Sequence, residues 1–212
     1  MARRSRFPGH WQVCIDPGDL ATLAAALPPR YVFFPHWSHI VPAAFLEQHE
    51  CVCFHMTDVP YGRGGSPLQN LVSRGHKETM LTALRMSSVL DAGPVYMKRP
   101  LDLSGTAEEI FRRAAALSIE MMANIVEVEP EPVPQSGDPV LFTRRVPAQS
   151  EIPSDGSFSM LYDHIRMMDA PGYPHAFVTH GRWVGSLTDA RLLPDTVEAR
   201  IRFTRKDGTT EA

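Results

Sequence analysis

The stretch from Cys51 to Ser66, CVCFHMTDVPYGRGGS, determines the fold more than any other part of the chain. Its first five residues, Cys51–His55, predict a short buried strand, because they are apolar or β-prone and turn-forming residues follow them. Side chains alternate along a strand, so Cys51, Cys53 and His55 share one face. A strand of this kind is expected inside a sheet.

The residues after this strand predict a loop followed by a helix. Residues 61–65, YGRGG, are rich in glycine, whose backbone freedom makes regular structure costly, so we expect an irregular loop. Ser66 is a good N-cap and Pro67 a good first helical residue, and Gly75 ends the predicted helix. A strand, a glycine-rich loop and a capped helix are how an α/β protein holds a ligand at a strand's carboxyl end.

Patterns on both sides extend this unit into an α/β fold. Asp16 and Pro17 predict a helix start, and Thr106 with Glu109 forms a capping box that opens a long helix. No GxGxxG motif is present, so the sequence does not predict a dinucleotide site. A further helix is predicted at residues 41–46, and strands are predicted at residues 11–15, 31–34, 79–86 and 95–99.

A proline-rich stretch divides the chain. Residues 127–134, EVEPEPVP, contain three prolines and alternating acids, which exclude a helix and a central strand. We therefore expect a domain over residues 1–126, a linker over 127–157 and a small subdomain over 158–212. This subdomain is expected to be mainly β, with a helix at residues 158–168 and strands at 176–178, 183–187 and 197–203.

Length and composition indicate a globular protein with one full core and a small appendage. Of the 212 residues, 43% are hydrophobic and 21% are charged, and the net charge of −3 does not favour a large nucleic-acid surface.

No segment is apolar enough to span a membrane, and the N-terminus lacks the apolar run of a signal peptide. Its basic residues Arg3, Arg4 and Arg6 are expected in solvent. Three cysteines do not suggest a disulfide framework, so we expect a cytoplasmic protein.

Three motifs resemble the formyltransferase family: His55–Pro60 (HMTDVP), Gly64–Gln69 (GGSPLQ) and Leu90–Gly93 (LDAG). That family transfers a formyl group from 10-formyltetrahydrofolate to an amine, and it includes enzymes that act on methionyl-tRNA, glycinamide ribonucleotide and amino sugars. The resemblance runs from about Phe33 to Ile125 and implies a Rossmann-like sheet. It also implies that the chain starts about one β-α-β unit late, so that the sheet is truncated at its N-terminal edge or another chain, such as a second copy, covers that edge.

The resemblance assigns catalysis to an Asn and a His two residues apart on the central strand, and to an Asp on a later loop. Formyl transfer passes through a tetrahedral oxyanion, so it needs a donor for that oxygen and a group that takes the amine proton. The matching residues are His55 and Asp91, whose carboxylate would fix the tautomer of the imidazole. The alternative is a buried histidine bonded to the backbone, with Asp91 only shaping its turn.

Cys53 stands where the family has its Asn. A thiol is a weak donor, and the loss of one oxyanion donor costs roughly 10²–10³ in rate. Three explanations compete. Another donor substitutes, with Thr57, Asn70 and the backbone amides of Gly64 and Gly65 as candidates; or the site is slow or inactive; or Cys53 is itself a nucleophile whose thiolate His55 favours.

Further side chains near these motifs are candidates for binding. Residues on one face of a strand are about 6.6 Å apart, too far for Cys51, Cys53 and His55 to share a tetrahedral metal ion, so we expect no metal. The resemblance implies that the loop from Met86 to Asp91 lines the pterin of the folate through its backbone. Trp37 is a candidate for folate or acceptor, or else a packed side chain between surface histidines; Arg63 meets an anion or is a solvated loop residue. The predicted cofactor-binding residues are Met86, Ser87, Ser88, Val89, Leu90 and Trp37, and the predicted substrate-binding residues are Arg63, Gly64 and Asn70.

The acceptor is predicted to be a small-molecule amine. Residues 126–212 contain nine Arg or Lys against thirteen Asp or Glu, a balance of −4 that does not favour tRNA or another nucleic acid. Residues 55–71, HMTDVPYGRGGSPLQNL, are similar to formyltransferases of surface-sugar biosynthesis, so a nucleotide-linked amino sugar is expected first and a small amine of secondary metabolism second. Three alternatives stay open: a degenerate module that binds folate or a partner chain, a methionyl-tRNA formyltransferase-like enzyme, and a hydrolase that releases formate.

Overall fold

The computed structural model describes residues 8–37 and 39–206. The expectation that Arg3, Arg4 and Arg6 are in solvent lies outside the described residues, and so does Ser38. The described residues form two compact units, one of residues 8–37, 39–63, 80–100 and 114–141, the other of residues 64–79, 101–113 and 142–206.

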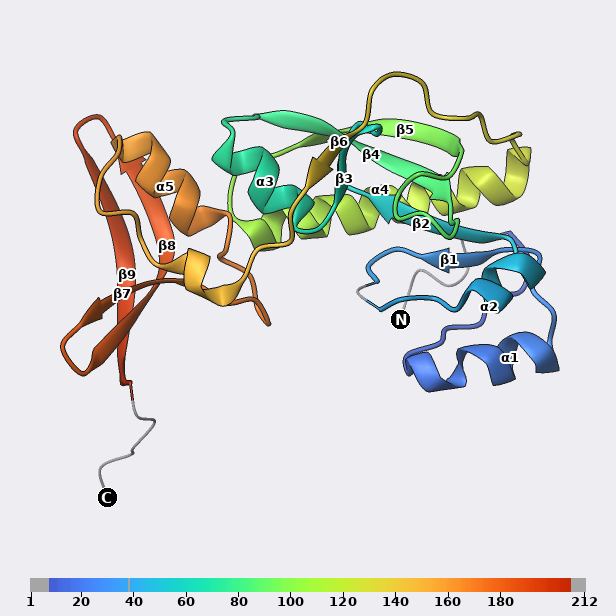
Figure 1. Cartoon of the computed structure of the whole chain (residues 1–212), viewed down its shortest axis with the longest axis horizontal. Helices are drawn as coiled ribbons and strands as arrows, with labels where there is room; N and C mark the ends of the chain where they lie inside the picture. Colours follow the sequence, from blue (N-terminus) through green and yellow to red (C-terminus); the bar gives the residue numbers. More distant parts are fainter. Residues whose placement is uncertain (1–7, 38, 207–212) are drawn as a thin grey trace. The chain divides into compact units, whose positions relative to one another are not determined.

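The first unit contains a mixed four-stranded sheet in the order β1-β2-β4-β5 (Figure 1). β1 runs parallel to β2, with Phe34 beside Cys53, and β2 runs antiparallel to β4, with His55 beside Thr82. β2 therefore lies between two strands, as its apolar sequence predicts. The strands are β1 Val32–Phe34, β2 Cys51–His55, β4 Glu78–Arg85 and β5 Val95–Asp102, and the last residues of β5 and the first of β4 belong to the second unit.

Short helices precede and connect the first two strands. The 3-10 turn η2 Pro17–Asp19 leads into α1 Leu20–Ala26, and Gly18 N donates to Oδ1 of the predicted cap Asp16 at 2.8 Å. α2 Ala43–Gln48 joins β1 to β2. One core cluster contains side chains from α1, β1, α2 and β2 and from the segment before α2, namely Ala24, Phe34, Val41, Phe45 and Cys51.

The long helix that the capping box predicts is α4 Ala107–Val128, which runs through both units. Thr106 N donates to Glu109 Oε2 at 2.8 Å, and Glu109 N donates to Thr106 Oγ1 at 3.3 Å, so the box is confirmed. The helix continues two residues into the stretch that was expected to exclude it. Its buried apolar side chains follow helical spacing: Ala107, Ile110, Ala114, Met121, Met122 and Ile125.

Two predictions of local structure are wrong. Residues 11–15 form no strand, because no other strand among the described residues pairs with them and Val13 and Ile15 are 65% and 90% exposed. Residues 61–65 are not an irregular loop, because β3 Tyr61–Gly64 pairs with β6 Val140–Phe142. The glycines allow this pairing rather than prevent it: Gly64 has φ +109°, and a Cβ there would lie 2.4 Å from Phe142 O.

Part of the segment predicted as a linker is bound to the strands of the first unit. Val133 and Val95 exchange two backbone hydrogen bonds of 2.8 and 2.9 Å, and Val140 N donates to Pro60 O at 3.1 Å. The 3-10 turn η3 Pro147–Ser150, later in the same segment, belongs to the second unit. The division at residues 126 and 157 stays a prediction.

The second unit contains α3, α5 and a separate antiparallel sheet, so the predicted β character of the C-terminal part is confirmed (Figure 1). Ser66 occupies the predicted N-cap position of α3, but its Oγ accepts a hydrogen bond from Arg145 N at 3.1 Å and does not cap the helix. In the described ranges, no helix combines the length and the apolar character that a membrane span requires. The elements are α3 Pro67–Ser73, α5 Phe158–Arg166, β7 Ala176–His180, β8 Trp183–Leu193 and β9 Thr196–Arg205.

Candidate active site

His55 and Asp91 lie together in the first unit. His55 is the last residue of β2, and Asp91 lies in the loop between β4 and β5. Nδ1 of His55 is 3.6 Å from Oδ2 of Asp91, and the two side chains are only 10% and 11% exposed. This separation is too long for a direct hydrogen bond, but it allows a strong ion pair when the imidazole is protonated.

The backbone of β3 fixes the orientation of the imidazole. Nε2 of His55 is 2.8 Å from Gly62 O. A carbonyl oxygen only accepts, so the hydrogen of the neutral ring is on Nε2 and the basic nitrogen is Nδ1, on the side of Asp91. The hydrogen bond to Gly62, and not the Asp91 carboxylate, therefore determines which ring nitrogen of His55 carries the hydrogen. Both arrangements considered from the sequence, a histidine bonded to backbone and a histidine beside a carboxylate, are present together.

The loop that holds Asp91 has an unusual backbone. Asp91 has φ +50°, a left-handed conformation that is uncommon for residues other than glycine. Gly93 fits only as glycine, because a Cβ there would lie 1.8 Å from Arg85 O. Val89 and Leu90, in the part of the loop predicted to contact the pterin, are 63% and 70% exposed. Contacts outside the loop therefore have to stabilise the position of Asp91.

Gln135 supplies such contacts. Its Nε2 donates to Asp91 O and to Gly93 O, both at 2.8 Å. Its Oε1 accepts two hydrogen bonds from Arg63, from Nε at 3.0 Å and from an Nη at 2.8 Å. Sequence reasoning missed Gln135, because a single glutamine in a proline-rich stretch carries no motif. The assignment of Arg63 to an anion stays a prediction, to which the structure adds this protein partner.

The Cys53 thiol is held in its protonated form. Burial raises its pKa to about 12, and the nearby Asp91 carboxylate adds to the effect. At pH 8 a thiol with that pKa is ionised in only about one molecule in 10⁴. A nucleophilic thiolate at this position, the third explanation for Cys53, is therefore disfavoured.

The substitute donors suggested by the sequence have partners within the protein. Thr57 donates its hydroxyl hydrogen to Gly62 O at 3.3 Å, and Gly65 N donates to Phe142 O at 3.1 Å. Nδ2 of Asn70 lies within 3.1 Å of three carbonyl oxygens, those of Gly65, Ser66 and Thr143. These contacts favour the second explanation, a site that lacks one oxyanion donor and is slow or inactive.

Trp37 is partly buried and packs against the core cluster of the first unit. The centroid of its ring lies 5.1 Å from the ring centroid of Phe34 and 5.4 Å from that of His39, and both pairs of rings meet edge to face. Its Nε1 is buried without a hydrogen-bond partner, and it is the one such side-chain atom among the residues that the structure describes. An unsatisfied buried donor costs about 1–3 kcal/mol. The assignment of Trp37 to folate binding stays a prediction.

The other predicted binding residues are distributed over both units. Arg63 is in the first unit, and Gly64 and Asn70 are in the second. At Gly64 the backbone passes close to the backbone of Phe142. Asn70 stabilises the start of α3, because its Nδ2 donates a hydrogen bond to Ser66 O. Across residues 8–37 and 39–206, no group of three or more His, Cys, Asp or Glu side chains is arranged to hold a metal ion.

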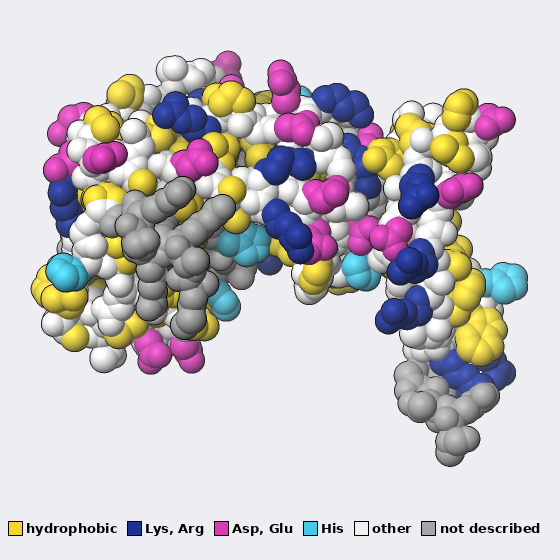
Figure 2. Space-filling model, turned by 180° about the vertical axis from the view of Figure 1, so that it is seen from behind, with side chains coloured by type: hydrophobic (Ala, Val, Ile, Leu, Met, Phe, Trp, Pro, Cys, Tyr) yellow, Lys and Arg dark blue, Asp and Glu magenta, His cyan; other side chains and the backbone are white. Residues whose placement is uncertain are grey.

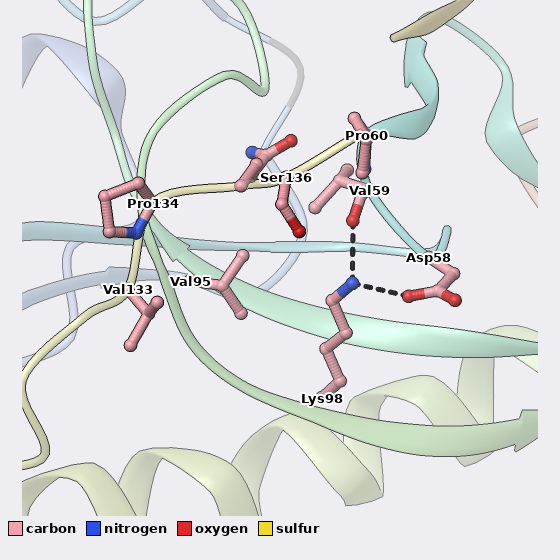
Figure 3. A pocket seen from close by; sticks show the side chains of 9 residues that line it. Asp58, Val59, Pro60, Val95, Lys98, Val133, Pro134 and Ser136 are labelled. Carbon is pink, nitrogen blue, oxygen red and sulfur yellow. Dashed lines mark hydrogen bonds and ion pairs between the residues drawn. The ribbon is translucent and has the colours of Figure 1, made fainter. Parts of the chain in front are cut away.

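A cavity of about 330 Å³ opens elsewhere in the first unit (Figure 3). Lys98 crosses it and donates to Asp58 Oδ1 at 2.5 Å and to Val59 O at 2.7 Å. Neither His55 nor Asp91 lines this cavity, although Gln135 does. Its remaining lining residues are Pro60, Val95, Val133, Pro134 and Ser136.

The chain is similar to known proteins in sequence and in fold. Residues 147–204 match the family model of the methionyl-tRNA formyltransferase C-terminal domain. Methionyl-tRNA formyltransferase of Wolinella succinogenes is 28% identical over 147 residues, which are 66% of this chain and 48% of that protein. The chain thus spans about half the length, or less, of the curated relatives it matches.

Two solved structures extend the comparison. Methionyl-tRNA formyltransferase from Clostridium thermocellum is 41% identical, with a TM-score of 0.87, over 90% of this chain and 85% of that one. A sugar N-formyltransferase from a Shewanella species is 15% identical, with a TM-score of 0.60, over 78% of this chain and 70% of that one, and it shows the fold alone.

These similarities define the class of the protein as a Rossmann-like formyltransferase fold. At 41% identity across most of both chains, the chain belongs to the formyltransferase family. The resemblance seen in the motifs around His55 and Asp91 is thereby confirmed.

Proposed function

We propose that this protein transfers a formyl group from 10-formyltetrahydrofolate to an amine, with His55 as the proton acceptor. The observation that supports this most is the buried pair of His55 and Asp91, with Gly62 leaving Nδ1 as the basic nitrogen. The amine nitrogen attacks the formyl carbon, and its proton moves to Nδ1 of His55. The resulting imidazolium is stabilised by the Asp91 carboxylate. The bond from the formyl carbon to the folate nitrogen then breaks, and that nitrogen takes up a proton, which releases tetrahydrofolate.

The formyl donor is expected at the loop from Met86 to Leu90. The exposed side chains of Val89 and Leu90 leave the loop accessible to a flat ligand, and Ser87 Oγ stabilises the turn by donating to Val89 O at 2.9 Å. Met86 and Trp37 both pack against the same core cluster, which links the two predicted folate segments within one unit.

For the acceptor, we now favour methionyl-tRNA over the nucleotide-linked amino sugar expected from the sequence. The relatives matched at 28% and 41% identity are named for methionyl-tRNA, and so is the family model over residues 147–204. The sugar enzyme is similar at 15% identity, which supports only the fold.

The distribution of charge agrees with a tRNA acceptor better than the overall count does. Residues 176–206, which include β7, β8 and β9 and the turns that join them, contain six Lys or Arg against three Asp or Glu, a balance of +3. The acidic excess in residues 126–212 therefore comes from residues outside this sheet. Figure 2 shows Lys and Arg side chains following one another along the part of the surface that contains it. Phosphate groups of an RNA are bound by such a surface. Its basic residues are Arg182, Arg191, Arg200, Arg202, Arg205 and Lys206.

One assay distinguishes these possibilities. The full chain is incubated with 10-formyltetrahydrofolate and methionyl-tRNA, with a panel of nucleotide-linked amino sugars, or with no acceptor, and the release of tetrahydrofolate is measured. Slow release that depends on methionyl-tRNA is expected. Release with one sugar only would show that the acceptor is a nucleotide-linked amino sugar. Release without any acceptor would indicate a hydrolase. Folate binding without turnover would indicate the degenerate module.

His55→Ala tests the proton acceptor in the same assay. Turnover is expected to fall to background while folate affinity stays within about threefold, because an interaction used mainly in the transition state is lost. His10→Ala, at an exposed position, is the matched control and is expected to leave both unchanged. Full turnover of the His55→Ala variant would exclude His55 as the proton acceptor.

A further inference from the structure

We propose that Gln135 is a positioning residue that holds the Asp91 carboxylate beside His55. This inference rests on the proposed function, because it gives Gln135 a role in that same site. The side-chain amide is fully occupied: Oε1 accepts from Arg63 at 2.8 and 3.0 Å, and Nε2 donates to Asp91 O and Gly93 O at 2.8 Å each.

The orientation of this amide follows from its partners. A guanidinium group only donates hydrogen bonds, so the oxygen of Gln135 has to face Arg63. Carbonyl oxygens only accept, so its NH₂ group has to face Asp91 and Gly93, and both of its hydrogens are used. A glutamate at this position would keep the contact with Arg63 and would place a carboxylate oxygen against two carbonyl oxygens.

The same contacts connect both members of the catalytic pair to one strand. On β3, Gly62 accepts from His55 Nε2 at 2.8 Å, and the next residue, Arg63, binds Gln135. Gln135 binds the backbone of Asp91, and the Asp91 carboxylate lies 3.6 Å from His55 Nδ1. These contacts form a closed ring of residues. A change in Gln135 therefore alters the distance between the Asp91 carboxylate and the His55 imidazole, although the Gln135 side chain binds neither of these two groups directly.

The loop needs an anchor of this kind. Asp91 has φ +50°, and its neighbour Leu90 is 70% exposed, so packing on that side contributes little. Gln135 itself is fixed by the chain around it, because Val133 exchanges two backbone hydrogen bonds with Val95. The proline-rich segment thereby has a role in the site in addition to connecting two parts of the chain.

The test compares Gln135→Glu with Ser136→Ala in the full chain. Ser136 is the next residue, is exposed, and has no role in the ring of contacts, so its variant is the matched control. Gln135→Glu is expected to lower kcat by roughly 10²-fold, the effect of a displacement of about 1 Å in a catalytic group. The KM for folate is expected to change less than about threefold, because the pterin contacts remain. Arg63→Met removes the two hydrogen bonds that Gln135 Oε1 accepts, so it is expected to lower kcat in the same way.

Two further readouts separate a positioning role from a general structural one. In an Asp91→Asn background, Gln135→Glu is expected to have no further effect on kcat, because both changes remove the same interaction. The NMR signals of the His55 ring, assigned by comparison with His55→Ala, are expected to change in Gln135→Glu as they change in Asp91→Asn. Melting temperatures of the variants measure any general loss of stability.

The outcomes are distinct. Unchanged kcat and unchanged His55 signals in Gln135→Glu, or additive losses with Asp91→Asn, would overturn the positioning role. If the native protein shows no turnover with any acceptor, the proposed function fails, and the His55 signals still decide whether Gln135 acts on the pair. If Gln135→Glu does not fold, the Arg63→Met variant decides by the same two readouts.

Discussion

At the scale of single residues, burial determines what Cys53 is able to do. The thiol lies on the same strand face as His55, but a pKa of about 12 keeps it protonated at any physiological pH. A protonated thiol is neither a good nucleophile nor a good donor to an oxyanion. The hydroxyl of Thr57 is already bonded to Gly62, so it does not compensate. We therefore expect chemistry at this site to be limited by the missing donor.

Cys53→Asn tests this expectation. A carboxamide at this position restores an N–H donor for the oxyanion, so turnover is expected to rise by about 10–100-fold, somewhat less than the full effect of such a donor. The measurement is the rate of tetrahydrofolate release at saturating acceptor. Cys53→Ala is the control and is expected to stay within about threefold of the native rate. A loss of 10²-fold or more in the alanine variant would instead show that the sulfur takes part in catalysis.

The same residues give the protein a predictable response to alkaline pH. The pKa values of Cys51 and Cys53 are raised to about 12 by burial, from about 9 for an exposed thiol. Well below pH 9 both thiols are protonated in the folded and the unfolded chain, and their contribution is complete. Between pH 9 and pH 12 the unfolded chain loses protons that the folded chain retains, so stability falls as the pH rises.

The urea midpoint measured from pH 8 to pH 11 is expected to fall above pH 9. In Cys53→Ala the fall is expected to be smaller, because one of the two thiols no longer contributes. An identical pH dependence in both proteins would contradict the assignment of the raised pKa to Cys53.

At the scale of elements, the pairing of β3 with β6 decides the local structure that the glycine-rich sequence leaves open. Gly62 and Gly64 have φ values of +77° and +109°, and both are accommodated within a strand. β6 lies more than seventy residues later in the sequence, so the pairing is a long-range contact. It brings the Gly62 carbonyl to His55 and Arg63 to Gln135.

Gly64→Ala is expected to destabilise the protein more than Gly75→Ala. Both glycines have positive φ, so both variants incur a strained backbone of order 1 kcal/mol. Only at Gly64 does the added Cβ also meet a carbonyl oxygen, at 2.4 Å from Phe142 O, whereas nothing lies within 4 Å at Gly75. We expect an additional loss of about 1–3 kcal/mol at Gly64, measured by urea unfolding. Equal losses in the two variants would show that β3 and β6 separate at little cost.

At the scale of the whole molecule, charge is distributed unevenly along the chain. The net charge is −3, yet residues 176–206 have a balance of +3. Arg200 and Arg202 lie on the same face of β9, two residues apart, and the Arg200 side chain is 77% exposed although it lies 3.3 Å from Asp189. Such a surface affects the binding of a polyanion much more than it affects stability.

The double variant Arg200→Glu/Arg202→Glu is expected to weaken the binding of methionyl-tRNA and to leave the melting temperature nearly unchanged. The slope of log K against log salt is expected to decrease by about 1–2, roughly 0.7–0.9 for each phosphate that the variant no longer binds. Arg99→Glu/Arg112→Glu, with the same charge change at exposed positions outside this sheet, is the control. Equal weakening in both double variants would argue against a specific role of the sheet, and no weakening in either would argue against a tRNA acceptor.

Much of this protein was predictable from local sequence. The apolar run at Cys51–His55 predicted β2 with its correct bounds, and the capping box at Thr106 predicted the start of α4. The motifs around His55 and Asp91 predicted the family. These signals are local because they depend on side-chain alternation, on capping hydrogen bonds and on short motifs, all of which lie within a few residues.

Tertiary structure alone decided three features of the candidate site. It placed Gly62 O at His55 Nε2, it bound Arg63 to Gln135, and it raised the pKa of Cys53 to about 12. The first depends on the pairing of β3 with the distant β6, the second on a partner 72 residues away and the third on exclusion from water, and the local pattern at residues 61–65 in fact favoured a loop. The amino-acid order specifies which residues are available for the chemistry. Long-range pairing determined their orientation, their protonation and their partners, because hydrogen bonds and desolvation depend on distances that only the folded chain defines.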